Sequence, residues 1–82
     1  MEKLNTPHPY RLIFAQNVRQ IRRLNEISQE ELALNAGISK TYICEIENGS
    51  RAVSIDIMGK ISDALNMPLE QLLIRDLLQP QT

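Results

Sequence analysis

The sequence predicts one all-α domain of five helices, and three observations lead to that prediction. The chain has 82 residues, enough for one domain with a limited core. Leucine and isoleucine dominate its apolar residues, aromatic residues make up 4% and tryptophan is absent, which suits packed helices better than a β-sandwich. Apolar residues also recur at helical spacing. The predicted domain covers residues 9–78, between an N-terminal arm of residues 1–8, expected to be mobile, and a C-terminal tail of residues 79–82.

The first predicted helix runs from Pro9 to about Asn25, because proline suits the first helical position. Phe14, Val18 and Ile21 follow one another at i, i+4 and i+7 and therefore form an apolar face. The other faces are expected to carry the arginines of this segment, Arg19, Arg22 and Arg23.

Residues 28–49 predict two short helices joined by a tight turn. Ser28 can cap the first of them, and Glu31, three residues later, completes a capping-box pattern. Gly37 ends this helix where a left-handed residue is favoured, and Ile38 follows as an apolar plug. The apolar stripe of this helix consists of Leu32, Ala33 and Ala36.

The second short helix is predicted from about Lys40 to Asn48, with Ser39 as its cap and Gly49 as its stop. Ile43 and Ile46 point to one side, which is expected to join the core. The opposite face is polar and consists of Lys40, Thr41, Cys44, Glu45 and Asn48. Such a face can reach base edges and phosphates from within a major groove, whereas an isolated helix would favour an ordinary solvated face.

Ser54 is the predicted cap of a fourth helix, about Ile55 to Leu65, and Asn66 can end it in a left-handed conformation. Its core face consists of Ile57, Met58, Ile61, Ala64 and Leu65. A fifth helix is predicted from about Leu69 to Leu78, because Pro80 forbids much continuation.

The fifth predicted helix is apolar on two sides. At about 100° per residue, four leucines share the face expected to join the core: Leu69, Leu72, Leu73 and Leu77. Ile74 and Leu78 are expected on the far side, where so small a monomer cannot bury them. The sequence therefore predicts a homodimer interface at Ile74 and Leu78. The alternative is that Leu4 and Tyr10 cover this patch.

The net charge of −1 does not by itself suggest a nucleic-acid partner, but its distribution is uneven. Residues 1–25 carry +4, residues 26–49 carry −4 and the remainder carries −1. Non-specific attraction to phosphates should therefore be modest.

The side-chain inventory argues against an enzyme, a metal site and a bound cofactor. The chain has one histidine, one cysteine and no glycine-rich phosphate loop. His8 lies between two prolines and has no neighbouring ligand to share a metal. A single cysteine excludes an internal disulfide, and no apolar run approaches the ~20 residues that span a bilayer. With no recognisable secretion signal, the expected location is the cytoplasm, free of membranes.

The stretch SQEELALNAGISKTYICEIENG resembles the helix-turn-helix of the lambda-repressor-like (XRE-like) DNA-binding family. The resemblance extends from about Val18 to Leu73. The run TYICEIENGSRAVSI is further similar to controller proteins of restriction–modification systems. The matching features are Ser28-Gln29, Leu32-Ala33, Gly37-Ile38-Ser39, Ile43, Ile46-Glu47 and Asn48-Gly49.

Base contacts are expected from the exposed face of the second short helix. Lys40 suits guanine O6 and N7, and Thr41 suits a base edge or a thymine methyl group. Glu45 is unusual, because phosphates would repel its carboxylate unless it accepts a hydrogen bond from a cytosine amino group. Cys44 is expected to be a small residue near the DNA, with a redox-sensing thiol as the alternative.

Contacts to the DNA backbone follow in part from the resemblance. In relatives, the match of Gln29 donates to a phosphate, and the match of Arg22 pairs with that of Glu47 near the backbone. The alternative for this pair is an exposed ion pair of little energetic value. Arg51 could contact the backbone or a minor groove, or remain solvated. Further backbone contacts are expected from Ser39, Tyr42, whose ring should pack on the core edge, and Asn48.

The chain departs from the family at position 26, where relatives usually have glycine. Because asparagine tolerates a left-handed conformation, Asn25 is expected to end the first helix one residue early in place of Glu26.

Two function classes follow from the sequence. The leading one is a sequence-specific transcription regulator that binds double-stranded DNA as a homodimer on a pseudo-palindromic operator, with recognition helices about 34–36 Å apart. This reading includes control of a restriction–modification operon. The alternative is an antitoxin-type module that caps a toxin and regulates its own operon. Contacts to a toxin or to RNA polymerase remain open.

Overall fold

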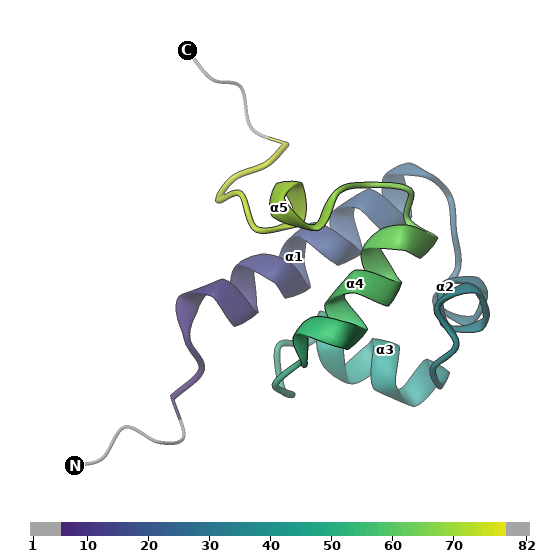
Figure 1. Ribbon diagram of the computed structural model, residues 1–82, viewed down its shortest axis with the longest axis horizontal. Coiled ribbons are helices and arrows are strands. Elements are labelled where there is room, and N and C mark those ends of the chain that lie inside the picture. Colours follow the sequence, from purple (N-terminus) through teal and green to yellow (C-terminus); the bar gives the residue numbers. More distant parts are fainter. Residues whose placement is uncertain (1–5, 79–82) are drawn as a thin grey trace.

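The computed structural model describes residues 6–78, and within them it contains five α-helices and no strand. The helices are α1 (Pro9–Leu24), α2 (Gln29–Ala36), α3 (Lys40–Glu47), α4 (Ile55–Ala64) and α5 (Leu69–Leu72). In Figure 1, α1 crosses the molecule, with α2, α3 and α4 on one side of it and α5 on the other. The predicted all-α fold with a central helix-turn-helix is confirmed. The predictions for residues 1–5, including Leu4, and for residues 79–82 lie outside the described residues.

All five helices contribute to one core. Its fully buried side chains are Phe14, Val18, Leu32, Ile43, Ile46, Ile61 and Leu72. The apolar face predicted for the first helix is confirmed, and Ile38 packs against the core as the plug of the turn. Of the residues described, no helix is long and apolar enough to cross a bilayer.

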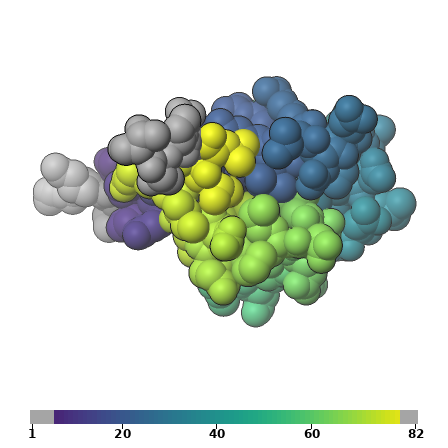
Figure 2. Space-filling view, turned by 90° about the horizontal axis from the view of Figure 1, so that it is seen from above, coloured from purple at the N-terminus to yellow at the C-terminus, as the bar shows by residue number. Residues whose placement is uncertain are grey.

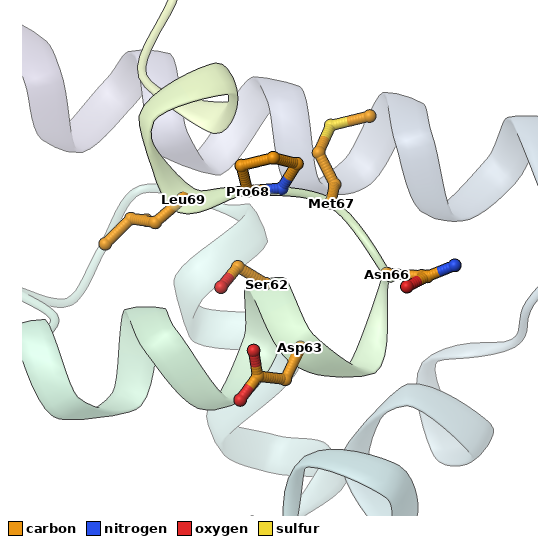
Figure 3. Close-up of a pocket in the computed structure, with 6 residues that line it drawn as sticks. All are labelled: Ser62, Asp63, Asn66, Met67, Pro68 and Leu69. Atoms are coloured by element: carbon orange, nitrogen blue, oxygen red, sulfur yellow. The ribbon is translucent and has the colours of Figure 1, made fainter.

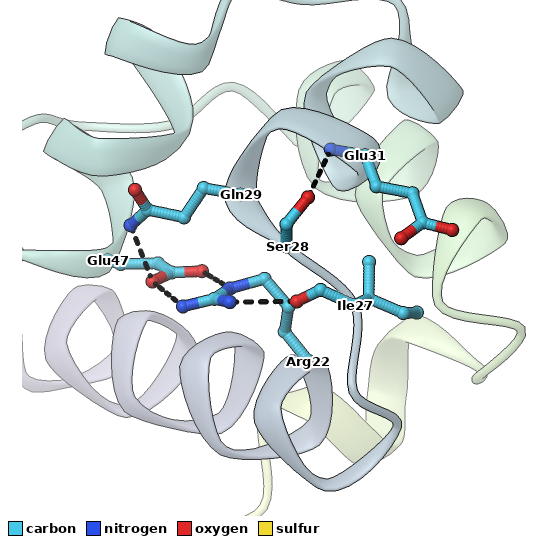
Figure 4. Close-up of polar contacts among 6 residues, drawn as sticks. All are labelled: Arg22, Ile27, Ser28, Gln29, Glu31 and Glu47. Carbon is cyan, nitrogen blue, oxygen red and sulfur yellow. Dashed lines mark hydrogen bonds and ion pairs between the residues drawn. The ribbon is translucent and has the colours of Figure 1, made fainter.

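Three serine caps start α2, α3 and α4 as predicted. Each serine Oγ accepts a hydrogen bond from the amide three residues later, at 3.0–3.1 Å: Ser28 from Glu31, Ser39 from Tyr42 and Ser54 from Ile57. Gly37 is left-handed, with a φ of 73°. The predicted capping box is only half formed, because the Glu31 carboxylate points away from Ser28 (Figure 4).

The helix α1 starts at Pro9 as predicted, but the residues that close its two ends differ from the sequence prediction. His8, assigned to the arm, caps α1, because its Nδ1 accepts a hydrogen bond from the Tyr10 amide at 3.0 Å. At the other end Glu26, not Asn25, is left-handed, with a φ of 59°. The amides of Glu26 and Ile27 bond to the carbonyls of residues 23 and 22, a turn in which residue 26 must be left-handed. The prediction that Asn25 replaces Glu26 there is therefore wrong.

The fifth helix is shorter than predicted, because it ends at Leu72 instead of continuing to Leu78. The Asn17 amide nitrogen, buried on α1, donates to the carbonyls of Leu72 and Ile74 at 2.8 and 2.9 Å. In a continued helix those carbonyls would accept from residues 76 and 78, so Asn17 stabilises the turns that replace the helix. Asp76 is left-handed in these turns.

The leucines of this segment still reach the core, where Leu72 is buried and Leu69, Leu73 and Leu77 pack against it. Figure 2 shows the C-terminal segment, in yellow, lying against the rest of the domain. Ile74 and Leu78 remain 43% and 45% exposed, as predicted, although they are not one turn apart on a helix.

Candidate nucleic-acid interface

The outer face of α3 carries the predicted polar side chains. Ile43 and Ile46 are buried on its inner side. A shallow depression on the outer side is lined by Lys40, Thr41, Cys44 and Glu45, and Asn48 continues this face at the C-cap. The structure thus brings together all four residues predicted to contact bases on one surface. Their contacts to bases stay predictions.

A second hollow lies at the N-terminus of α2 and adjoins the start of α3. Its lining residues come from three helices and the turn before α2: Arg22, Arg23, Ser28, Gln29, Glu30 and Lys40. The positive end of the α2 dipole faces the same region. Basic side chains at a helix N-terminus form a favourable surface for a phosphate. Sequence reasoning missed Arg23, because its exposed position beside Lys40 depends on how α1 and α3 pack.

The predicted pair of Arg22 and Glu47 is present, and it is buried. Arg22 Nε donates to Glu47 Oε2 at 2.6 Å and Nη2 donates to Oε1 at 3.0 Å, with side chains only 10% and 3% exposed (Figure 4). Nη1 donates to the Ile27 carbonyl at 2.8 Å. The hydrogen bond with Glu47 raises the pKa of Arg22 above its ordinary value, although burial opposes the shift. The alternative of an exposed pair is therefore wrong.

This network also includes Gln29, whose Nε2 donates to Glu47 Oε1 at 3.1 Å. The network ties the end of α1, the start of α2 and the end of α3 to one another. Because three of its five N–H donors are engaged inside the protein, Arg22 positions the surface around it. A direct contact of Arg22 or Gln29 with a phosphate stays a prediction.

At the other end of the α3 face, Arg51 lies beside Tyr42 and Glu45. Its Nη1 donates to Glu45 Oε1 at 2.7 Å, and its guanidinium carbon lies 4.5 Å from the centroid of the Tyr42 ring. The Tyr42 ring packs against the core, as predicted. The Glu45 carboxylate, predicted to accept a hydrogen bond from a cytosine amino group, thus has Oε1 paired with Arg51.

The end of α3 is also fixed to α1. Arg11 Nε donates to the Gly49 carbonyl at 3.0 Å. Gly49 is left-handed with a φ of 73°, and a Cβ there would lie 2.7 Å from Leu12 Cδ2. Sequence reasoning missed Arg11, because a basic residue on the first turn of a helix carries no signal of such a contact.

The other predicted DNA-contacting residues on α3 and at its caps make fewer contacts within the protein. Cys44 is exposed, and Asn48 Nδ2 lies 4.0 Å from its sulfur. The Ser39 hydroxyl is engaged in capping α3. No group of three potential metal ligands occurs in the part of the chain that the structure describes.

Another hollow lies at the turn between α4 and α5. It is lined by Ser62, Asp63, Asn66, Met67, Pro68 and Leu69 (Figure 3). Asp63 is the one ionisable side chain among these six, and a single carboxylate does not make an acid–base pair. The α3 face is therefore the stronger candidate for function.

The chain is similar to known helix-turn-helix proteins in both sequence and structure. The Helix-turn-helix family model HTH_3 matches residues 18–72. The chain is 48% identical to the control protein C.BamHI of Bacillus amyloliquefaciens over 64 residues, which cover 77% of this chain and 79% of the relative. It is 40% identical to the control protein C.SmaI of Serratia marcescens, over 77% of this chain and 75% of the relative.

Among solved structures, the restriction-modification controller protein C.AhdI from Aeromonas hydrophila matches with a TM-score of 0.75 and 30% identity. The match covers 82% of this chain and all of that one.

Proposed function

The chain belongs to the helix-turn-helix family HTH_3, and from that premise we propose that it is a transcription regulator that binds a specific sequence of double-stranded DNA. Relatives named as control proteins favour a role in a restriction–modification operon over the antitoxin alternative. The same names favour a role without catalysis, and the cytoplasm remains the predicted location.

The observation that carries this proposal is the outer face of α3. Its polar side chains are exposed together, while the opposite side of the helix is anchored in the core. A helix held in this way can enter a major groove without moving relative to the domain. In this proposal Lys40, Thr41 and Cys44 face the bases, while Arg23, Gln29 and Asn48 lie toward the phosphates.

The test begins with selection of duplexes from a random-sequence library by the wild-type protein. Lys40→Ala should then weaken binding by ~1–3 kcal/mol and relax the preference at one base pair of each half-site, because a bidentate contact to guanine is lost. Fluorescence anisotropy on the selected duplex and its single-base variants measures both effects.

Lys60→Ala, on the exposed surface of α4, is the matched control and should leave affinity and base preference unchanged. Recovery of no preferred sequence by the wild-type protein would overturn the proposed function. Equal weakening of all duplexes by Lys40→Ala would make Lys40 a phosphate contact.

A further inference from the structure

Arg51 is held in place by its backbone as well as by its side chain. The chain turns back at the end of α3, where the Ser50 amide and hydroxyl both donate to the Glu45 carbonyl, at 3.1 and 3.2 Å. This turn brings Arg51 back over the last turns of α3, next to the side chains of Tyr42 and Glu45. The position of Arg51 is thus defined before any ligand is present.

The Arg51 guanidinium contacts two side chains of the protein and leaves its other donors exposed. The Tyr42 ring supports one side from the core, and the Glu45 carboxylate binds Nη1. The Arg51 side chain is still 54% exposed, and an arginine has five N–H donors, so several donors remain free for a ligand. The hydrogen bond that Arg51 donates to Glu45 also raises the pKa of Arg51 above its ordinary value.

The pairing changes what Glu45 can do. Arg51 donates to Oε1 of the carboxylate, and this bond joins two opposite charges, whereas a cytosine amino group would offer the carboxylate only a neutral donor. An unpaired carboxylate beside phosphates would also be repelled, whereas a carboxylate paired with Arg51 is largely compensated. Both effects favour a Glu45 that keeps its partner.

We propose that Glu45 is a positioning residue for Arg51: it holds the guanidinium against Tyr42, so that Arg51 contacts a DNA phosphate at the edge of the α3 face, and Glu45 itself reads no base. This inference rests on the proposed function. It means that a residue that contacts no base also contributes to specificity, because an arginine fixed at one point favours one docking geometry of the duplex.

The test is a double-mutant cycle with Glu45→Ala, Arg51→Ala and the double variant. Affinities are measured by anisotropy on the duplex selected by the wild-type protein and on its single-base variants. With Arg51 present, removal of the carboxylate frees the guanidinium and should weaken binding. With Arg51 absent, the same change removes only repulsion and should strengthen binding. The two effects of Glu45→Ala should therefore differ by more than twofold, and by up to about fivefold for an exposed pair.

Two further readouts separate positioning from a structural role. The base preference of Glu45→Ala should equal that of the wild type at every position. Arg51→Ala should lower the slope of log affinity against log salt by about one, as expected for a lost phosphate contact. Glu70→Ala, on α5 across α1 from α3, is the charge-matched control and should show no coupling to Arg51 (Figure 1).

Coupling of twofold or less would overturn the inference, as would a changed base preference in Glu45→Ala or an unchanged salt slope in Arg51→Ala. Far-UV circular dichroism and thermal unfolding of each variant confirm that these exposed substitutions leave the fold intact. If the wild-type protein selects no sequence, the proposed function fails and this inference fails with it. If it selects one and the cycle shows no coupling, the inference alone fails.

Discussion

At the scale of single residues, the buried ion pair of Arg22 and Glu47 joins three helices at one point. An arginine and a carboxylate removed from water lose much of their hydration, and only a partner with good geometry compensates for that loss. Here two hydrogen bonds link the charged groups, and Ile27 and Gln29 satisfy further atoms. The pair therefore specifies how α1 and α3 meet more than it adds net stability.

Glu47→Gln should destabilise the fold by roughly 3–5 kcal/mol, because it leaves the Arg22 charge buried without a counter-charge. Urea unfolding followed by far-UV circular dichroism measures the change. Glu45→Gln, on the same helix but in an exposed pair, is the matched control and should cost less than about 1 kcal/mol. Replacing both partners, with Arg22→Met and Glu47→Leu, should recover most of the loss. A cost below ~1 kcal/mol for Glu47→Gln would show that the pair is hydrated.

At the scale of elements, glycine and serine define where the short helices begin and end. Gly37 and Gly49 follow α2 and α3 in left-handed conformations, both with a φ of 73°, whereas Gly59 lies inside α4 with ordinary helical geometry. A Cβ would meet nothing within 4 Å at Gly37 or Gly59. Backbone conformation, not space, therefore distinguishes these positions.

Gly37→Ala and Gly49→Ala should each destabilise the protein by about 1–2 kcal/mol, because alanine is strained in the left-handed region. At Gly49 the added methyl group meets Leu12 Cδ2, but this is the end of a half-exposed side chain that can turn away, so little is added. Gly59→Ala should instead stabilise by about 1 kcal/mol through better helix propensity. Thermal and urea unfolding of the three variants provide the comparison. A loss of stability in Gly59→Ala would contradict this account.

Elements whose signals lie within a few residues could be predicted from the sequence. Ser28 caps its helix through the amide of residue 31, and Gly37 lies directly after the helix it ends. The end of α5 could not be predicted, because Asn17 and Leu72 are 55 residues apart in the chain.

In the candidate site, too, the local pattern could be predicted from the sequence and the contact between separate segments could not. The polar face of α3 follows from helical periodicity, so its residues were predictable. The pairing of Glu45 with Arg51 was not, because it depends on the direction in which the chain leaves Gly49.

At the scale of the whole molecule, a homodimer interface at the exposed Ile74 and Leu78 stays a prediction. The turns of residues 73–78 run on the side of α1 that carries α5, away from α3 in Figure 1. Association there would leave both α3 faces free for DNA. A two-fold axis would relate them, as a pseudo-palindromic operator requires.

Ile74→Lys combined with Leu78→Lys should yield a folded monomer whose operator binding is much weaker, because two charges would be buried in the interface. Analytical ultracentrifugation measures the oligomeric state, and anisotropy measures binding. Leu34→Lys is the matched control, because Leu34 is an 81% exposed leucine on α2 and its replacement should leave the dimer intact. A double variant that stays dimeric and binds normally would exclude this interface.

The two hydrogen bonds from Asn17 bear on how such a regulator could diverge from its relatives. Through them a single side chain on α1 sets the path of the segment that carries Ile74. In the proposed dimer, that path determines how far apart two copies of α3 lie, while the side chains of α3 determine which bases each copy prefers. The spacing of the half-sites then depends on residue 17, and the sequence of each half-site depends on the side chains of α3. Mutations in different codons therefore change the two properties. A lineage of these proteins could acquire a new operator length by substitution at residue 17 and keep its old half-site, or the reverse.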